Sequence, residues 1–482
     1  MTNETLEIDA LKEKDGGGEA VQAVEELEPL GEKRIRLARQ VGLVCMVTLA
    51  YVSLGAIITW PSPALSSLAE NNATLVGTEV VFNSTQKDMT GSLAFVGTLL
   101  GAWLAGLAVN KLGRLISLQI IVVPYLVGWI VTALAPTTSV LLIGRFVVGL
   151  ASGGTTIAGY AYVIELSDVN IRGMMATIPT MGVVLGSLYT VAFGYVLPWH
   201  YLSIVCALPP FLFLICTFFL PASPSFLVVR GRRQQAIAIL TRLRGRYADV
   251  EAEVLELERR NAVNSGTKRS SWRDMLERDV LRRMGVVITL FVLMQLCGNF
   301  VLMSYTARIL EATGASMDPD AITVIAGVLR VAGTLTAILV LDVIGRRYCL
   351  IISHAINACC LILLGAYVYL AEHADPTDDT YKNLTWVPTV CVTMSLFICD
   401  VGVHPVPFIV SSEYFPTSIR AQASSVCIST GTIATFLALQ LYSVMQEALT
   451  QPGLYWFYGA VSVFGVVFSF VAVIETKGET VG

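Results

Sequence analysis

Twelve long apolar runs constrain the fold of this chain more than any other feature of its sequence. A helix that crosses a bilayer needs about 20 mostly apolar residues. Backbone polar groups in hydrocarbon must be satisfied inside the segment, so each run predicts a helix. The sequence therefore predicts an all-α membrane protein. The twelve expected spans are 41–60, 91–110, 116–135, 140–162, 174–196, 200–220, 285–304, 321–341, 349–371, 386–410, 423–445 and 454–473.

Charged residues are too few for a soluble protein of this length. Only 14% of the 482 residues are charged, against about 25% in soluble domains. The ten cysteines are scattered without metal-ligand spacing. We find no nucleophile–base motif and no phosphate-binding loop. We therefore expect no enzyme, no cofactor, no metal site and no nucleic acid partner.

The chain divides into five parts. Residues 1–38 are polar, lack the apolar run of a signal peptide, and are expected to form a disordered cytosolic tail. Six spans fall in 39–220 and six in 285–474. Between them lies a cytosolic linker, 221–284, in which Ala- and Leu-rich charged stretches predict short helices, or alternatively a solvated segment. Residues 475–482 are expected to be a short cytosolic tail.

Basic residues set the expected orientation. Arginines crowd the central linker and the short loops on the same side, whereas the opposite loops carry only Lys87 and Lys382. Because cytosolic loops are enriched in Lys and Arg, both termini and the linker are expected to be cytosolic.

Three glycosylation sequons agree with this orientation. Asn72, Asn83 and Asn383 each begin an Asn-x-Ser/Thr triplet, and all three fall in loops assigned to the outside. They suggest a glycoprotein of the secretory pathway and point to the plasma membrane. Asn383 lies close to a predicted span, which disfavours its modification.

The two halves carry matching loop motifs. A Gly-Arg turn follows the second and eighth spans, at Gly113-Arg114 and Gly345-Arg346. A Glu-to-Arg motif of identical spacing follows the fourth and tenth spans, running from Glu165 to Arg172 and from Glu413 to Arg420. Two six-helix halves around a central linker form a transporter architecture.

These motifs resemble those of the sugar porter family of the major facilitator superfamily, and within it the insect facilitated trehalose and hexose transporter group. Further marks are Gly144-Arg145, Gln295-Leu-Cys-Gly298 and Gly402-x-x-Pro405-Val-Pro407. The resemblance implies two pseudo-symmetric six-helix halves in a major facilitator fold. It also implies a facilitative carrier that works by alternating access, as a monomer in the lipid bilayer, on a small polar solute such as trehalose or glucose.

The loop motifs contain charges of both signs that can pair. The resemblance implies a cytosolic gate in which these ion pairs hold the inner ends of the halves together while the cavity faces outward. The alternative is that the arginines only enforce topology. The expected gate residues are Arg114, Glu165, Arg172, Asp342, Arg346, Glu413 and Arg420.

The expected substrate-binding side chains depart from the family pattern. Sugar recognition relies on amides, which both donate and accept hydrogen bonds, and most of the family's amide positions carry other residues here. This weakens the step from the scaffold to a sugar. The candidate binding residues are Thr180, Gln295, Tyr305, Arg330, Asp400 and His404, the last with packing as its alternative role.

Arg330 and Asp400 are expected to lie at the same depth. Arg330 precedes Asp342 by 12 residues and Asp400 precedes Glu413 by 13. Both should therefore lie roughly 18–20 Å from the cytosolic helix ends. An ionisable residue at that depth needs a partner or a cavity, so we expect them to pair and to face the solute. The alternative is a static pair that locks the second half.

Gly402, Pro405 and Pro407 predict a break in the tenth span, because proline cannot donate a helical hydrogen bond. The break is interpreted as a hinge, with a simple kink as the alternative.

Two other functions remain open. A proton-coupled symporter is disfavoured because 41–60 contains no acidic residue. A transporter-like nutrient sensor is disfavoured because such relatives carry long cytosolic tails.

Overall fold

The computed structural model of the protein describes residues 30–168, 171–245, 248–266, 274–313, 317–373, 384–415 and 419–475. Within these residues twelve helical segments are long and apolar enough to cross a membrane, which confirms the predicted number. The predicted 1–29 and 476–482 tail residues and the sequon residue Asn383 lie outside the described part of the chain.

The first half of the protein is a bundle of eight helices that supply six spans, the sixth being divided between α9 and α10. The helices are α3 (Leu30–Thr59), α4 (Pro61–Glu70), α5 (Ser84–Leu112), α6 (Arg114–Ala133), α7 (Thr138–Leu166), α8 (Arg172–Gly194), α9 (Trp199–Cys206) and α10 (Leu208–Thr217).

The linker forms three short helices, as expected, and the second half supplies the other six spans. The linker helices are α11 (Pro224–Val229), α12 (Arg233–Arg244) and α13 (Val250–Gly266). The second half contains α14 (Arg278–Leu296), α15 (Asn299–Ala312), α16 (Pro319–Ile344), α17 (Arg346–His373), α18 (Val387–Ile398), η4 (Cys399–Val403), α19 (Pro405–Glu413), α20 (Arg420–Gln440) and α21 (Tyr442–Ala472), preceded by a short 3₁₀ turn, η2 (Asp274–Leu276).

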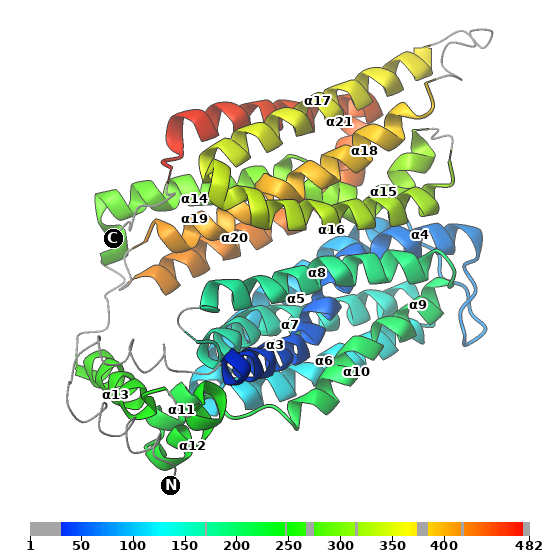
Figure 1. Ribbon diagram of the computed structural model, residues 1–482. Coiled ribbons are helices and arrows are strands. Elements are labelled where there is room, and N and C mark those ends of the chain that lie inside the picture. The colour runs from blue at the N-terminus through cyan, green and yellow to red at the C-terminus, as the bar shows by residue number, and fades with distance from the viewer. Residues whose placement is uncertain are drawn as a thin grey trace.

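The halves lie side by side, and all three linker helices lie at one end of the bundle (Figure 1). We call this end the linker side and the opposite end, which carries α4, the distal side. Each half has its own buried apolar core. The main contacts between the halves are those of α5 with α20 and of α8 with α16.

Small residues allow the helices of the first half to approach closely. A Cβ atom on Gly153 of α7 would lie 1.9 Å from the carbonyl oxygen of Thr98 on α5, and a Cβ on Gly101 would lie 2.0 Å from that of Leu150. In membranes, where water does not drive helices together, such backbone contact is a main source of association. The glycines therefore hold α5 and α7 together as one unit.

Most of the membrane-spanning helices begin before the predicted start of their span, and the first two spans show this with consequences for named residues. The first span starts at Leu30, so the disordered tail expected over 1–38 is wrong for residues 30–38. The second starts at Ser84 instead of 91, because Asn83 and Gln86 form a capping box that satisfies the first helical amides. This extension brings Asp88 into the helix.

Candidate functional site

Arg330 and Asp400 form a buried ion pair inside the second half. The Nε of Arg330 donates to Oδ2 of Asp400 at 2.7 Å. Their side chains are 4% and 1% exposed, respectively, so neither charge is solvated by bulk water. The two residues come from α16 and η4, and the predicted proximity is therefore present in the structure.

The tenth span positions Asp400 on a single π-helical turn. The turn runs from Cys399 to Val403, and the amide of His404 donates to the carbonyl of Cys399, five residues back, at 2.8 Å. Pro405 and Pro407 follow within the first turn of α19. Proline is tolerated there because the backbone amides of a first turn have no acceptor within that helix. The helix is thus interrupted at the predicted place, and such π-turns are frequent at functional sites.

Gly402 lets this turn pack against α17. A Cβ atom there would lie 2.4 Å from the hydroxyl of Ser353 and 2.6 Å from the carbonyl oxygen of Cys349. The glycine is therefore needed for close helix contact at the site of the expected hinge.

A small cavity of mixed polar and apolar lining lies between the halves next to this ion pair. Its volume is about 10 Å³, room for roughly one water molecule. The first half contributes hydroxyls from α3 and α8, and the second half contributes hydroxyls from α15 and α16 together with the guanidinium of Arg330. The polar lining residues are Thr59, Ser187, Thr306, Thr323 and Arg330.

Three polar side chains near the α14–α15 junction have atoms without hydrogen-bond partners. Gln295, a predicted binding residue, has an unpaired Oε1, and neither polar atom of the Asn299 side chain is paired. Asp400 retains an unpaired Oδ1. Buried polar atoms are normally satisfied, so these groups are candidates for contact with a solute or with water. Asn299 was missed by the sequence analysis, although an amide inside an apolar run is itself a signal.

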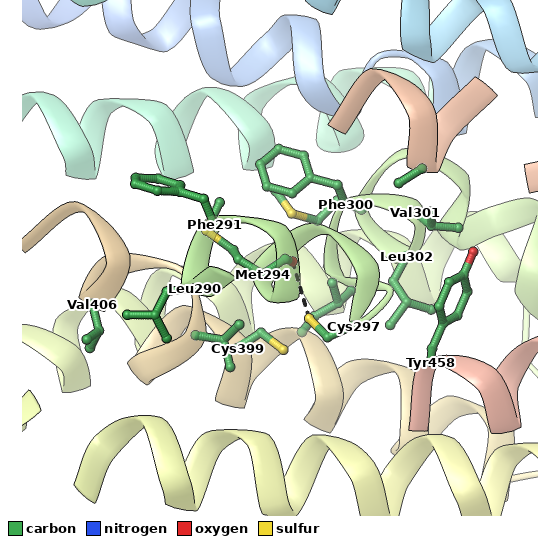
Figure 2. Close-up of a cluster of buried hydrophobic side chains, with 14 of the residues drawn as sticks. Leu290, Phe291, Met294, Cys297, Phe300, Val301, Leu302, Cys399, Val406 and Tyr458 are labelled. Carbon is green, nitrogen blue, oxygen red and sulfur yellow. Dashed lines mark hydrogen bonds between the residues drawn. The ribbon is translucent and has the colours of Figure 1, made fainter. Parts of the chain in front are cut away.

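Apolar side chains surround this junction and belong to the buried core of the second half. Figure 2 shows Phe291, Met294, Phe300 and Cys399 gathered around the point where α14 ends and α15 begins. The helices meet at Gly298, whose φ of +87° is a left-handed conformation that favours glycine. The Gln-x-x-Gly motif thus forms a bend in the seventh span.

The other predicted binding residues lie in different surroundings. Tyr305 is fully buried at a kink of α15, and its hydroxyl donates to the carbonyl of Asp88 at 3.1 Å. His404 packs between the rings of Phe300 and Phe408, each with a centroid separation of 6.0 Å, which favours its packing role. Thr180 is exposed on α8 and is not part of the cavity lining.

The predicted gate residues form equivalent ion pairs in the two halves. Arg114 lies 2.8 Å from Glu165, and Arg346 lies 3.2 Å from Glu413 and 3.1 Å from Asp342. Both sets lie on the linker side, and each joins helices of a single half.

Arg172 and Arg420, the other two predicted gate residues, are not ion-paired in the same way. The Nε of Arg172 is buried without a hydrogen bond, and Arg420 donates to the carbonyl of Phe415 at 3.1 Å. In this arrangement the gate ion pairs lie inside each half, and Arg420 contacts the backbone at Phe415.

A buried arginine in the first half was noted in the sequence only as a family mark. The guanidinium carbon of Arg145 lies 4.9 Å from the ring centroid of Trp60 and 5.9 Å from that of Trp129, and the two indoles also contact each other with centroids 6.3 Å apart. Its NH2 donates to the carbonyl of Ile57 at 2.7 Å. That carbonyl lacks a helical donor because Pro61, four residues later, has no amide hydrogen. Arg145 therefore satisfies the backbone carbonyl left without a donor where α3 ends and α4 begins.

The linker helices are attached to the first half by another buried arginine. Arg244 of α12 lies 2.8 Å from Asp168 and 3.0 Å from Glu253, and it also donates to the carbonyls of Leu166 and Ser167. The linker is therefore anchored to the end of α7, next to the Glu-to-Arg motif.

Comparison with known proteins gives one family match and many relatives. The profile of the family described as "Sugar (and other) transporter" matches residues 45–482. The facilitated trehalose transporter Tret1 of Drosophila erecta is 28% identical over 444 residues, covering 92% of this chain and 51% of that protein. Tret1 of Drosophila virilis is 28% identical over 487 residues, covering 98% and 53%. The chain thus spans about half the length of these curated relatives.

Solved structures of a bacterial protein share the fold. The inward-open conformation of the xylose transporter XylE from E. coli matches with a TM-score of 0.74 at 21% identity, covering 92% of this chain and 98% of that one. The proton:xylose symporter XylE bound to 6-bromo-6-deoxy-D-glucose matches with a TM-score of 0.69 at 22% identity, with the same coverage.

Proposed function

Because this chain belongs to the family of sugar and other transporters, we propose that it is a facilitative carrier that moves a sugar across a membrane by alternating access. It is a multi-pass membrane protein with the major facilitator fold. Trehalose and glucose are the first candidate substrates, trehalose being the sugar named for its insect relatives.

The cavity between the halves supports this proposal most directly. Its hydroxyls come from both halves, and the ion pair beside it is neutral overall. A neutral polyol suits such a lining, since each sugar hydroxyl both donates and accepts while a guanidinium only donates and a carboxylate only accepts. The unpaired Oδ1 of Asp400, the unpaired Oε1 of Gln295 and the unpaired amide of Asn299 supply further polar groups.

The size of the cavity bears on the mechanism. At about 10 Å³ it is far smaller than the few hundred Å³ of a typical ligand site. A sugar can enter only if the halves separate. Residues Gln295, Arg330 and Asp400 then contact the solute from the second half, while Ser187 contributes from the first.

We infer the orientation from charge. The arginine-rich linker side is cytosolic by the positive-inside rule, which places both termini in the cytosol and the distal side outside. Asn72 is half-buried in the loop between α4 and α5, and the exposed Asn83 caps α5, so both sequons lie on the distal side. We propose a monomer of the plasma membrane that is glycosylated at these two positions.

Uptake by a host that lacks its own sugar carriers tests the proposal. The host expresses the full chain and receives radiolabelled trehalose, glucose, or a charged solute of similar size. Saturable uptake of a sugar that disappears in Arg330→Gln and persists in Arg232→Gln, an exposed linker control, supports the proposal. Uptake of no sugar by a correctly localised protein contradicts it.

Proton coupling is the second candidate, and the observation that favours it is the buried carboxylate of Asp400 with one unpaired oxygen. Measuring uptake after collapse of the pH gradient distinguishes facilitative uniport from proton-coupled symport. A uniporter continues to equilibrate its sugar, whereas a symporter loses accumulation above the external concentration.

A further inference from the structure

Asp88 is a buried carboxylate whose side-chain partners come from the opposite half of the protein. It lies near the distal end of α5 and is 1% exposed. Its Oδ2 accepts from the amide of Ser443 at 2.8 Å, and its Oδ1 accepts from the Ser443 hydroxyl at 2.8 Å. Arg308 NH1 lies 3.8 Å from Oδ1. Ser443 belongs to α21 and Arg308 to α15, whereas Asp88 belongs to the first half.

Aromatic rings enclose this carboxylate. The hydroxyl of Tyr305 donates to the carbonyl of Asp88, and the Tyr305 ring stacks on Tyr442 with centroids 5.0 Å apart. The guanidinium of Arg308 lies 5.3 Å from the centroid of Tyr442. We call Asp88, Tyr305, Arg308, Tyr442 and Ser443 the Asp88 cluster.

Two local features of α5 and α15 allow these helices to pack closely at the Asp88 cluster. Gly91 lies one turn after Asp88, and a Cβ atom there would be 2.8 Å from the Tyr305 hydroxyl. The backbone of α15 leaves helical geometry at Tyr305 (φ −131°, ψ 23°), and the amide of Ala307 then donates across to the Ser62 hydroxyl at 3.1 Å. The bend therefore turns both the Tyr305 ring and the Ala307 amide, which is released from helical hydrogen bonding, toward the first half.

The other polar contacts across the same seam are single hydrogen bonds. Ser92 donates to Gln440, Ser304 to the carbonyl of Ile58, and Ser66 to Asp320. Among these distal contacts, Asp88 combines burial, a formal charge and partners on two different helices of the second half. Separation of the halves here would remove all of its side-chain partners at once.

We propose that Asp88 is the residue that locks the extracellular face shut in the cytosol-facing state. A buried carboxylate needs charged or hydrogen-bonding partners. In the shut state Ser443 and Arg308 provide them, and in the open state water replaces them. The lock rests on the alternating access proposed above, but its closure is a property of the protein that exists without any solute.

Accessibility of a cysteine beneath the cluster tests the lock. Met303 lines the cavity and is 3% exposed, and it lies on α15 before Tyr305. We expect Met303→Cys to react slowly with a membrane-impermeant maleimide added outside intact cells. In the Asp88→Asn background the reaction should be at least about tenfold faster, because hydrogen bonds to a charged group are lost. Modification is read at the peptide that contains the new cysteine, so native cysteines do not interfere.

Matched variants separate the lock from general disruption. Ser443→Ala removes one hydrogen bond but leaves the carboxylate, and should accelerate labelling less than Asp88→Asn does. Gly91→Ala should also accelerate it, whereas Gly106→Ala, on the same helix with nothing within 4 Å of the added carbon, should not. Glu79→Gln, an exposed carboxylate in the α4–α5 loop, is the charge control.

Equal labelling rates in wild type, Asp88→Asn and Ser443→Ala would overturn the lock, whether or not a sugar is transported. Conversely, failure to find a transported sugar would count against the proposed function and leave the labelling result intact. Asp88→Asn and Arg308→Gln should be non-additive when combined, because both remove the same contact. Additive effects would argue against a shared lock.

Discussion

Arg330 Nε lies 2.7 Å from Asp400 Oδ2, although the two residues belong to different spans and are 70 positions apart in the chain. Both side chains of the pair are buried, and Oδ1 of Asp400, which does not face Arg330, has no hydrogen-bond partner. A charge in this position depends on its partner, so the two residues should behave as a unit.

Removing one member of this pair should cost more than removing both. Arg330→Gln leaves a buried carboxylate unpaired, and we expect a loss of about 3–5 kcal/mol in the free energy of unfolding. The double variant Arg330→Met with Asp400→Leu should recover most of that stability. It should not recover sugar uptake. Thermal unfolding in detergent and uptake in cells measure the two effects separately. Wild-type uptake by the double variant would contradict a solute-binding role.

Arg145 should tolerate no other cation. Lysine keeps the charge but cannot donate to the carbonyls of Ile57 and Thr90 together while contacting both indole rings. We expect Arg145→Lys to destabilise the protein by about 3 kcal/mol through lost hydrogen bonds and cation–π contact. A fall in melting temperature, compared with Arg232→Lys in the exposed linker, is the measurement. An unchanged melting temperature would show that the α3–α4 break does not need the guanidinium.

Gly153 should accept no side chain. An added methyl group would meet the carbonyl of Thr98 at 1.9 Å, which is backbone and cannot rotate away. We expect Gly153→Ala to destabilise the first half by about 3 kcal/mol, at the upper end of overpacking effects. Gly106→Ala is the matched control because its added carbon meets nothing within 4 Å. Fluorescence-detected size exclusion reports folding of both variants. Identical profiles would contradict close packing of α5 and α7.

Arg244 should hold the linker helices in place. Arg244→Ala removes contacts to Asp168 and Glu253 from a nearly buried position. Hydrogen exchange should then increase at least about tenfold in α12 and α13, because charge-assisted hydrogen bonds are lost, while α16 and α17 stay unchanged. The control is Arg233→Ala, whose pair with Glu258 at 3.4 Å is exposed on both sides. Exposed pairs contribute only about 0–1 kcal/mol, so that variant should exchange like wild type.

The register of the Arg330–Asp400 pair could be predicted because it depends on local rules. Each residue precedes a loop motif by a similar number of helical positions, and a helix converts residue number into depth. The turns at Gly113 and Gly345, both with positive φ, could be predicted for the same reason. Apolar run length likewise gave the correct number of spans.

The Asp88 cluster could not be predicted in this way. Asp88 and Ser443 are separated by 355 positions, and no local pattern joins them. The apolar run was expected to start at 91, which left Asp88 in a loop, because hydropathy ignores the capping box that starts the helix at Ser84. The π-turn beneath Asp400 was also invisible, since it adds one residue to a helical turn without changing the composition of the span.

Hydrogen bonds of serine, tyrosine and backbone groups cross the seam at the distal side, around the carboxylate of Asp88. Water can replace such bonds when the seam opens, so each contributes only about 0.5–1.5 kcal/mol net, or about 1.5–3 kcal/mol when it meets a charged group. An apolar seal offers no such exchange, because every exposed Å² of it costs free energy. Opening these hydrogen-bonded contacts therefore costs less free energy than exposing an apolar seal of the same area. A low cost of opening suits the facilitative carrier proposed above, because the turnover of such a carrier is limited by the slower of its two reorientations.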